Sequence, residues 1–189
     1  MYLKQLINSN KTVFSLVDMG NIWRIENKNY LKLVANRLFR RGEIIRLSRG
    51  IYAISEKFNQ NELANKLKIP SYVSLETVLQ KEGVVFQDYS NTIFSVSNNS
   101  LVKKIGSKTF QYAKLGDKLL MNPAGLANVG QVKIASIERA ICDRIYLSAD
   151  YYFDNLRGVN LEKLSTVAKI YNPRVQREVK MLIKEIKNK

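Results

Sequence analysis

The stretch from Arg24 to Ile54, RIENKNYLKLVANRLFRRGEIIRLSRGIYAI, decides the fold of the N-terminal region. From Arg24 to Tyr52 it holds eight Lys or Arg residues and two Glu. Its first half has the periodicity of a helix, and its second half has two short β-like runs on either side of a glycine. This order predicts a recognition helix followed by a basic β-hairpin, as in a winged helix-turn-helix.

The predicted recognition helix spans Asn29 to Arg41 and has two different faces, because an α-helix turns about 100° per residue. The apolar face is formed by Leu31, Val34, Ala35 and Leu38. The polar face, whose members lie within roughly 80° of one another, is formed by Asn29, Lys32, Asn36 and Arg40. The apolar face can dock on preceding helices while the polar face enters the major groove of DNA.

The polar side chains of this region have the chemistry of base and phosphate recognition. Arg can bind guanine O6 and N7, and Asn can bind adenine N6 and N7. Arg37 and Arg41 flank the polar face and suit phosphates. Arg46 and Arg49 belong to the hairpin, where Gly50 permits a tight turn and brings Arg49 to its tip. Any one of these side chains, taken alone, is equally consistent with a solvated charge.

The rest of the predicted N-terminal domain, residues 1–58, supplies the support for that helix. We expect helices at 2–7 and 12–19 before it, and strands at 44–47 and 51–54 after it. Trp23, Phe39 and Tyr52 are interpreted as core residues rather than base-stacking residues, because they lie among aliphatic neighbours. The polar stretch KFNQNELANKLKIPSYV predicts a junction to a second domain at residues 59–189.

The second domain is predicted to be α+β, which makes the whole chain α+β. We expect a helix over 74–83 with Ser74 as its N-cap and Gly83 as its stop. Strands are predicted at 92–97, 109–115 and 131–134, and helices at 136–147, 161–170 and 174–187.

The chain of 189 residues has a formal net charge of +15, which indicates a polyanionic partner. Basic and acidic residues number 11 and 4 in 1–60, 12 and 9 in 61–158, and 8 and 3 in 159–189. The excess therefore lies at the two ends. The C-terminal cations have two interpretations, the solvated face of two helices or a second contact with the DNA backbone. These cations are Lys163, Lys169, Arg174, Arg177, Lys180, Lys184, Lys187 and Lys189.

Residue usage argues against an enzyme, a metal site or a cofactor. The sequence has no histidine, the commonest general base and zinc ligand, and one cysteine, Cys142, which is interpreted as a small buried residue. Glu138 and Asp143 are expected to pair with Arg139 and Arg144. The N-terminus lacks the pattern of a signal peptide, and no apolar run of about 18 residues exists, so we expect a cytoplasmic protein with no membrane partner.

Several segments together resemble the AbiEi family of abortive-infection antitoxins, the transcriptional regulators of type IV toxin–antitoxin pairs. They are FSLVDMGNIW, YLKLVANRLFRRGEIIRLSRGIYAI, YVSLETVLQKEGVV, TFQYAKL and KIASIERAICDRIYL. The resemblance runs from about Val13 to Leu147. It implies a bacterial phage-defence protein whose winged helix binds inverted repeats in the promoter of its own operon, as a repressor, and whose C-terminal domain serves antitoxicity.

The resemblance also implies a functional partner, a nucleotidyltransferase-like toxin, without implying a stable complex with it. Its DNA-contacting positions fall on basic residues of the matching segment: Arg37, Arg40, Arg41, Arg46 and Arg49. A second hypothesis remains open, a stand-alone winged-helix regulator whose C-terminal domain senses a ligand or a protein. A neighbouring reading frame for such a toxin would separate the two.

Overall fold

The computed structural model describes residues 1–148 and 150–188 and is a mixed α+β fold with two sheets. The chain divides into two compact units, Met1–Ile69 and Pro70–Lys189. The division lies after the helix that follows the hairpin, not at the predicted 58/59 boundary, because that helix packs on the first unit.

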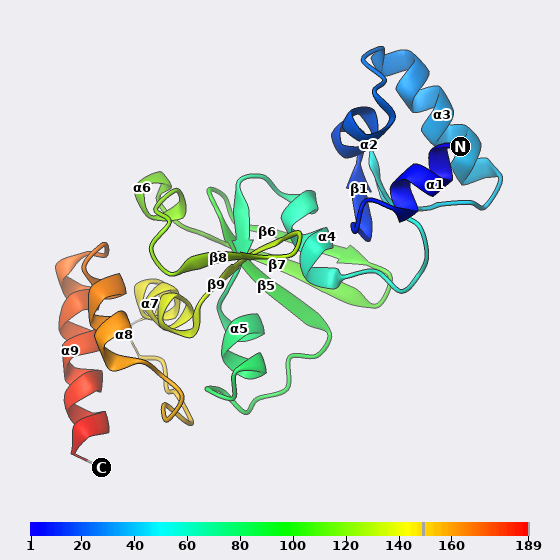
Figure 1. Cartoon of the computed structure of the whole chain (residues 1–189). Coiled ribbons are helices and arrows are strands. Elements are labelled where there is room, and N and C mark those ends of the chain that lie inside the picture. The colour runs from blue at the N-terminus through cyan, green and yellow to red at the C-terminus, as the bar shows by residue number, and fades with distance from the viewer. Residues whose placement is uncertain (149, 189) are drawn as a thin grey trace. The chain divides into compact units, whose positions relative to one another are not determined.

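The first unit combines helices with short strands (Figure 1). Its elements in chain order are α1 (Tyr2–Ile7), β1 (Val13–Ser15), α2 (Leu16–Trp23), α3 (Lys28–Arg40), β2 (Ile45–Ser48), β3 (Ile51–Ala53) and α4 (Gln60–Leu67). The strands form one antiparallel sheet in the order β1-β3-β2. The helix expected at 12–19 is correct only in its second half, because Val13–Ser15 forms β1. The helix begins after Ser15, whose side chain caps it together with Asp18.

The core of the first unit lies between α1, α2, α3 and the sheet. Its buried side chains include Leu6, Phe14, Met19, Trp23, Leu31, Leu38 and Ile44. Trp23 packs on Tyr2 and donates its indole N–H to the Tyr2 carbonyl at 3.1 Å. Trp23 and Tyr52 are core residues as predicted, whereas Phe39 is 40 % exposed and the prediction for it is wrong.

The second unit is built on a six-stranded mixed sheet in the order β6-β7-β5-β4-β9-β8. Its strands are β4 (Ser71–Val73), β5 (Thr92–Ser97), β6 (Leu101–Ile105), β7 (Lys108–Lys114), β8 (Leu126–Val129) and β9 (Val132–Ala135). Its helices are α5 (Glu76–Lys81), α6 (Asp117–Leu120), α7 (Ile137–Leu147), α8 (Leu161–Ala168) and α9 (Pro173–Lys187). Helices α7, α8 and α9 pack on one another (Figure 1).

The helix predicted at 74–83 is shorter and begins differently. Leu75, not Ser74, precedes its first turn, and Leu75 has a φ of 56° that non-glycine residues rarely adopt. Ser74 is buried and donates its hydroxyl to Asp143 at 2.7 Å. Gly83, with a φ of +67°, ends the helix as predicted.

Candidate nucleic-acid interface

Helix α3 is held against α2 by a close crossing and a polar cap. A Cβ on Gly20 would lie 3.2 Å from a side-chain carbon of Leu31, so glycine lets the two helices approach. Asn27 caps α3, because its side-chain oxygen accepts from the backbone N–H groups of Asn29 at 3.0 Å and Tyr30 at 3.1 Å. The start and direction of α3 are therefore fixed by local contacts.

The two predicted faces of α3 are confirmed as buried and exposed. The buried residues are Leu31, Val34, Ala35 and Leu38. The exposed residues are Asn29, Lys32, Asn36, Arg37 and Arg40. Within the described residues, none of these five exposed side chains forms a hydrogen bond or an ion pair, so their polar groups are open to a ligand. What they bind stays a prediction.

The other three predicted arginines lie beyond the end of α3. Arg41 is the C-cap and has a Glu43 oxygen 3.8 Å from its guanidinium, an exposed contact worth little. Arg46 and Arg49 are exposed on the hairpin, a separate element. Gly50 has the positive φ of +72° that the tip requires, and the pairing of β2 with β3 is irregular between Arg46 and Ser48.

Sequence reasoning missed one side chain in the middle of the exposed face. Leu33 is 45 % exposed and does not pack in the core of the unit. By helical geometry it falls within roughly 60° of Asn29, Asn36, Arg37 and Arg40. The helical spacing of the sequence places Leu33 on this face, but leucines in such helices are usually buried, so its exposure was not predicted.

A groove with a volume of about 780 Å³ opens beside the turn between α2 and α3. Leu16, Val17 and Leu31 contribute apolar lining, and Arg24 and Lys28 add positive charge. The groove also includes Lys32 of the polar face. Glu26 of the same turn also lines the groove, so the charge on the turn before α3 is mixed, with more basic than acidic side chains.

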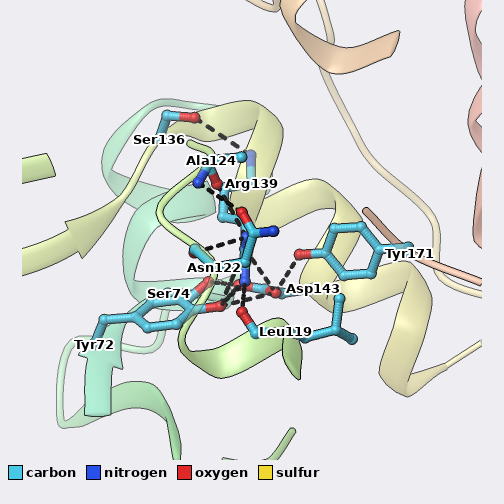
Figure 2. A network of polar contacts seen from close by, with 9 residues as sticks. All are labelled: Tyr72, Ser74, Leu119, Asn122, Ala124, Ser136, Arg139, Asp143 and Tyr171. Atoms are coloured by element: carbon cyan, nitrogen blue, oxygen red, sulfur yellow. Dashed lines mark hydrogen bonds and ion pairs between the residues drawn. The ribbon is translucent and has the colours of Figure 1, made fainter. Parts of the chain in front are cut away.

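The second unit contains a different polar cluster, centred on Arg139 and Asp143 (Figure 2). Arg139 and Asp143 are both completely buried, and the Arg139 Nε lies 3.3 Å from Asp143. Asp143 also accepts hydroxyl hydrogen bonds from Tyr72, Ser74 and Tyr171. Burial raises the pKa of Asp143, and the Arg139 charge with these donors opposes that rise.

The expected charge pairing around α7 is correct in part. Asp143 pairs with Arg139, but Arg144 pairs with Glu76 at 3.5 Å and Glu138 pairs with Lys163 at 3.1 Å. Hydrogen bonds, first from Ser136, hold the pKa of Glu138 below its ordinary value against the opposing effect of burial. These acidic groups therefore form ion pairs that hold α7 against its neighbours. Cys142 is buried as predicted, and burial raises the pKa of its thiol.

The C-terminal cations are divided between internal and exposed positions. Arg174 donates to the Ile145 and Tyr146 carbonyls and pairs with Glu178, so it packs α9 on the end of α7. Five other cations are exposed and form no side-chain hydrogen bond or ion pair within the described residues: Lys169, Arg177, Lys180, Lys184 and Lys187. Lys189 lies outside the described residues.

In the described parts of the chain, no three His, Cys, Asp or Glu side chains gather where they can share a metal ion. Among the same residues, no helix combines the length and the apolar character that a bilayer crossing requires. No protein-family model matches the sequence, and no curated protein matches it either.

Proposed function

We propose that Met1–Ile69 is a winged helix-turn-helix domain that binds duplex DNA. The observation that carries this proposal is the exposed face of α3, where five polar or cationic side chains without internal partners stand on a helix fixed by its buried side. DNA offers such a face both phosphates and base edges. A binding role, not catalysis, fits these residues.

The arrangement of elements supports the same proposal. Helices α2 and α3 form the helix pair, and β2 and β3 form the wing beside them. In this arrangement Asn36 and Arg40 reach base edges, and Arg37 and Arg41 reach phosphates. Arg49, at the tip of the wing, reaches the minor groove or a phosphate, with Arg46 behind it.

We further propose that the chain is the autorepressor and antitoxin of a type IV toxin–antitoxin pair. The resemblance of the segments between Val13 and Leu147 to AbiEi proteins supports this role. The partner is then a nucleotidyltransferase-like toxin, and the DNA site lies in the promoter of the shared operon. The alternative is a stand-alone regulator, which the same DNA-binding surface supports equally.

The DNA-binding proposal is tested by the affinity of the full chain for duplex DNA that carries its own promoter. Arg40→Ala is expected to raise Kd about 5- to 150-fold, because one bidentate base contact is worth about 1–3 kcal/mol. The matched control is Arg157→Ala, which removes the same charge from an exposed position of the second unit. Equal losses of affinity in the two variants would contradict a specific role for α3.

The antitoxin proposal is tested by growth. Co-expression of this chain with the nucleotidyltransferase-like product of an adjacent reading frame is expected to restore growth that the product alone prevents. The Arg40→Ala variant is expected to rescue growth when both genes are driven by foreign promoters, because antitoxicity then needs no operator binding. Failure of the unaltered chain to rescue would leave the stand-alone regulator as the better proposal.

A further inference from the structure

An aliphatic side chain stands in line with the polar side chains of α3. Asn29, Leu33, Asn36 and Arg40 are spaced by four, three and four residues, so they follow one another along a single stripe of the helix. Leu33 is 45 % exposed and is one turn from each of the two asparagines. A leucine is thus presented to whatever ligand this stripe contacts.

The charge around Leu33 restricts what that ligand is. Lys32, Arg37 and Arg40 surround it without acidic partners in the described residues. A second copy of this chain docking by the same face would bring like charges together, which opposes association. A duplex provides phosphates for the cations and, on the floor of the major groove, one apolar group at the C5 position of a pyrimidine.

We infer that Leu33 contacts the C5-methyl group of a pyrimidine in the major groove and makes the DNA site dependent on that methyl. The inference rests on the proposed DNA binding and adds a contact between those of Asn29 and Asn36. The methyl belongs to thymine or to 5-methylcytosine, which present it at the same place. Burying the methyl against Leu33 removes apolar surface of both from water, and this favours a methylated pyrimidine at one position of the site.

The test begins with duplexes selected by the full chain from a random pool. Each thymine of the selected site is then replaced by deoxyuridine, which lacks only the methyl. The expected result is a rise in Kd of about fourfold at one position, because one buried methyl is worth about 0.8 kcal/mol. A parallel series replaces each cytosine by 5-methylcytosine. Discrimination in the first series identifies thymine, and a gain of affinity in the second identifies 5-methylcytosine.

Variants then assign the discrimination to Leu33. Leu33→Ala is expected to bind the methylated and unmethylated duplexes equally, while Leu33→Met keeps the preference. The control is Val102→Ala, which removes an exposed aliphatic side chain of β6 in the second unit and is expected to keep the preference in full. Thermal unfolding is expected to be unchanged in Leu33→Ala, since the side chain is half exposed.

Two results would overturn the inference, and they differ from failure of the proposed function. If the chain selects a DNA sequence but binds it equally well with and without the methyl at every position, DNA binding is retained and the inferred role of Leu33 is wrong. Retention of the full preference in Leu33→Ala has the same meaning. A chain that binds no duplex at all removes both the proposed function and this inference.

Discussion

Arg139 shows how a completely buried charge is accommodated in the second unit. Its guanidinium donates to the Tyr72 hydroxyl and to the carbonyls of Leu119 and Ala124, in addition to its contact with Asp143. These partners come from β4, α6, the turn after α6, and α7. The Arg139 side chain therefore joins its own helix, α7, to β4 and to the segment that contains α6 and the turn after it.

Replacing Arg139 with methionine is expected to lower the free energy of unfolding by about 3–5 kcal/mol, because it leaves the buried Asp143 carboxylate without its cation. Urea denaturation followed by circular dichroism measures the change. Arg177→Met, on the exposed side of α9, is the control and is expected to change stability by less than about 0.5 kcal/mol. Similar effects of the two substitutions would refute this account of the cluster.

Leu33 and Phe39 are two residues whose exposure helical spacing did not predict. The spacing correctly placed the polar face and the buried stripe of α3. It does not report how far the neighbouring elements extend around the helix. Leu33 lies beyond their reach, and Phe39 lies at the margin, so both stay partly exposed although leucine and phenylalanine usually pack inside.

At the level of elements, those with strong local signals were predicted well. The strand Thr92–Ser97 is confirmed at both ends, and α7 begins after its cap Ser136. Among the missed strands, β1 depends on a distant partner, because Val13 pairs with Ala53 of β3, whereas β6 pairs with β7 and β8 with β9 across tight turns. Strands β6 and β8 are short and lie at the two edges of the sheet, so each pairs with one neighbour only. Runs this short are weak signals, because β-propensity depends strongly on context.

Helix α4 was also missed, since its polar sequence suggested a junction. Its position is set by contacts with residues about fifty positions earlier: Glu62 accepts from the backbone and the hydroxyl of Thr12. Lys66 binds Asp18 at 2.8 Å, and Lys11 binds the same carboxylate at 2.6 Å. Asp18 therefore joins α2, α4 and the loop before β1.

The Asp18 contacts predict acid sensitivity of the first unit. Burial disfavours its charge, but hydrogen bonds from Lys11, Lys66 and Ser15 outweigh burial and hold the pKa of Asp18 well below its ordinary value. A lowered folded-state pKa stabilises the fold above the unfolded value of about 4, and this stabilisation is lost as pH falls towards the folded value. Thermal unfolding can be followed by the fluorescence of Trp23, the single tryptophan. The unfolding temperature is expected to decrease as the pH is lowered below about 4.

Asp18→Asn tests this origin of the acid sensitivity. The variant is expected to be less stable at pH 7 and to lose less stability on acidification than the unaltered chain. Glu56→Gln, which changes an exposed carboxylate of the same unit, is the control and is expected to keep the original pH dependence. The same steepness in Asp18→Asn as in the unaltered chain would exclude the Asp18 contacts as the cause.

At the level of the whole molecule, positive charge occurs on exposed helix faces of both units. On α9, Arg177, Lys180, Lys184 and Lys187 are spaced by three, four and three residues, which places them along one face. The side of α9 that packs inward carries Val175 and Val179. Both readings of these cations, a solvated face and a second contact with the DNA backbone, are compatible with this placement.

Salt dependence separates the two readings. If the lysines of α9 contact phosphates, replacing Lys180, Lys184 and Lys187 with glutamine should reduce the slope of log K against log salt by about 0.9 for each lost contact. The control replaces Lys104, Lys114 and Lys118, which are exposed lysines of the same unit. An unchanged slope in the α9 variant, or an equal reduction in both variants, would leave the solvated face as the role of α9.

Strand β3 has a consequence for the length of the DNA site. It is the middle strand of the first sheet, and the Gly50 carbonyl just before it accepts the backbone N–H of Leu16, where α2 begins. The tip of the hairpin is thereby tied to the helix pair. On a duplex bound as proposed, the distance between the α3 contact and the Arg49 contact is therefore fixed. Inserting one base pair between these two positions of the DNA site would remove one of the two contacts.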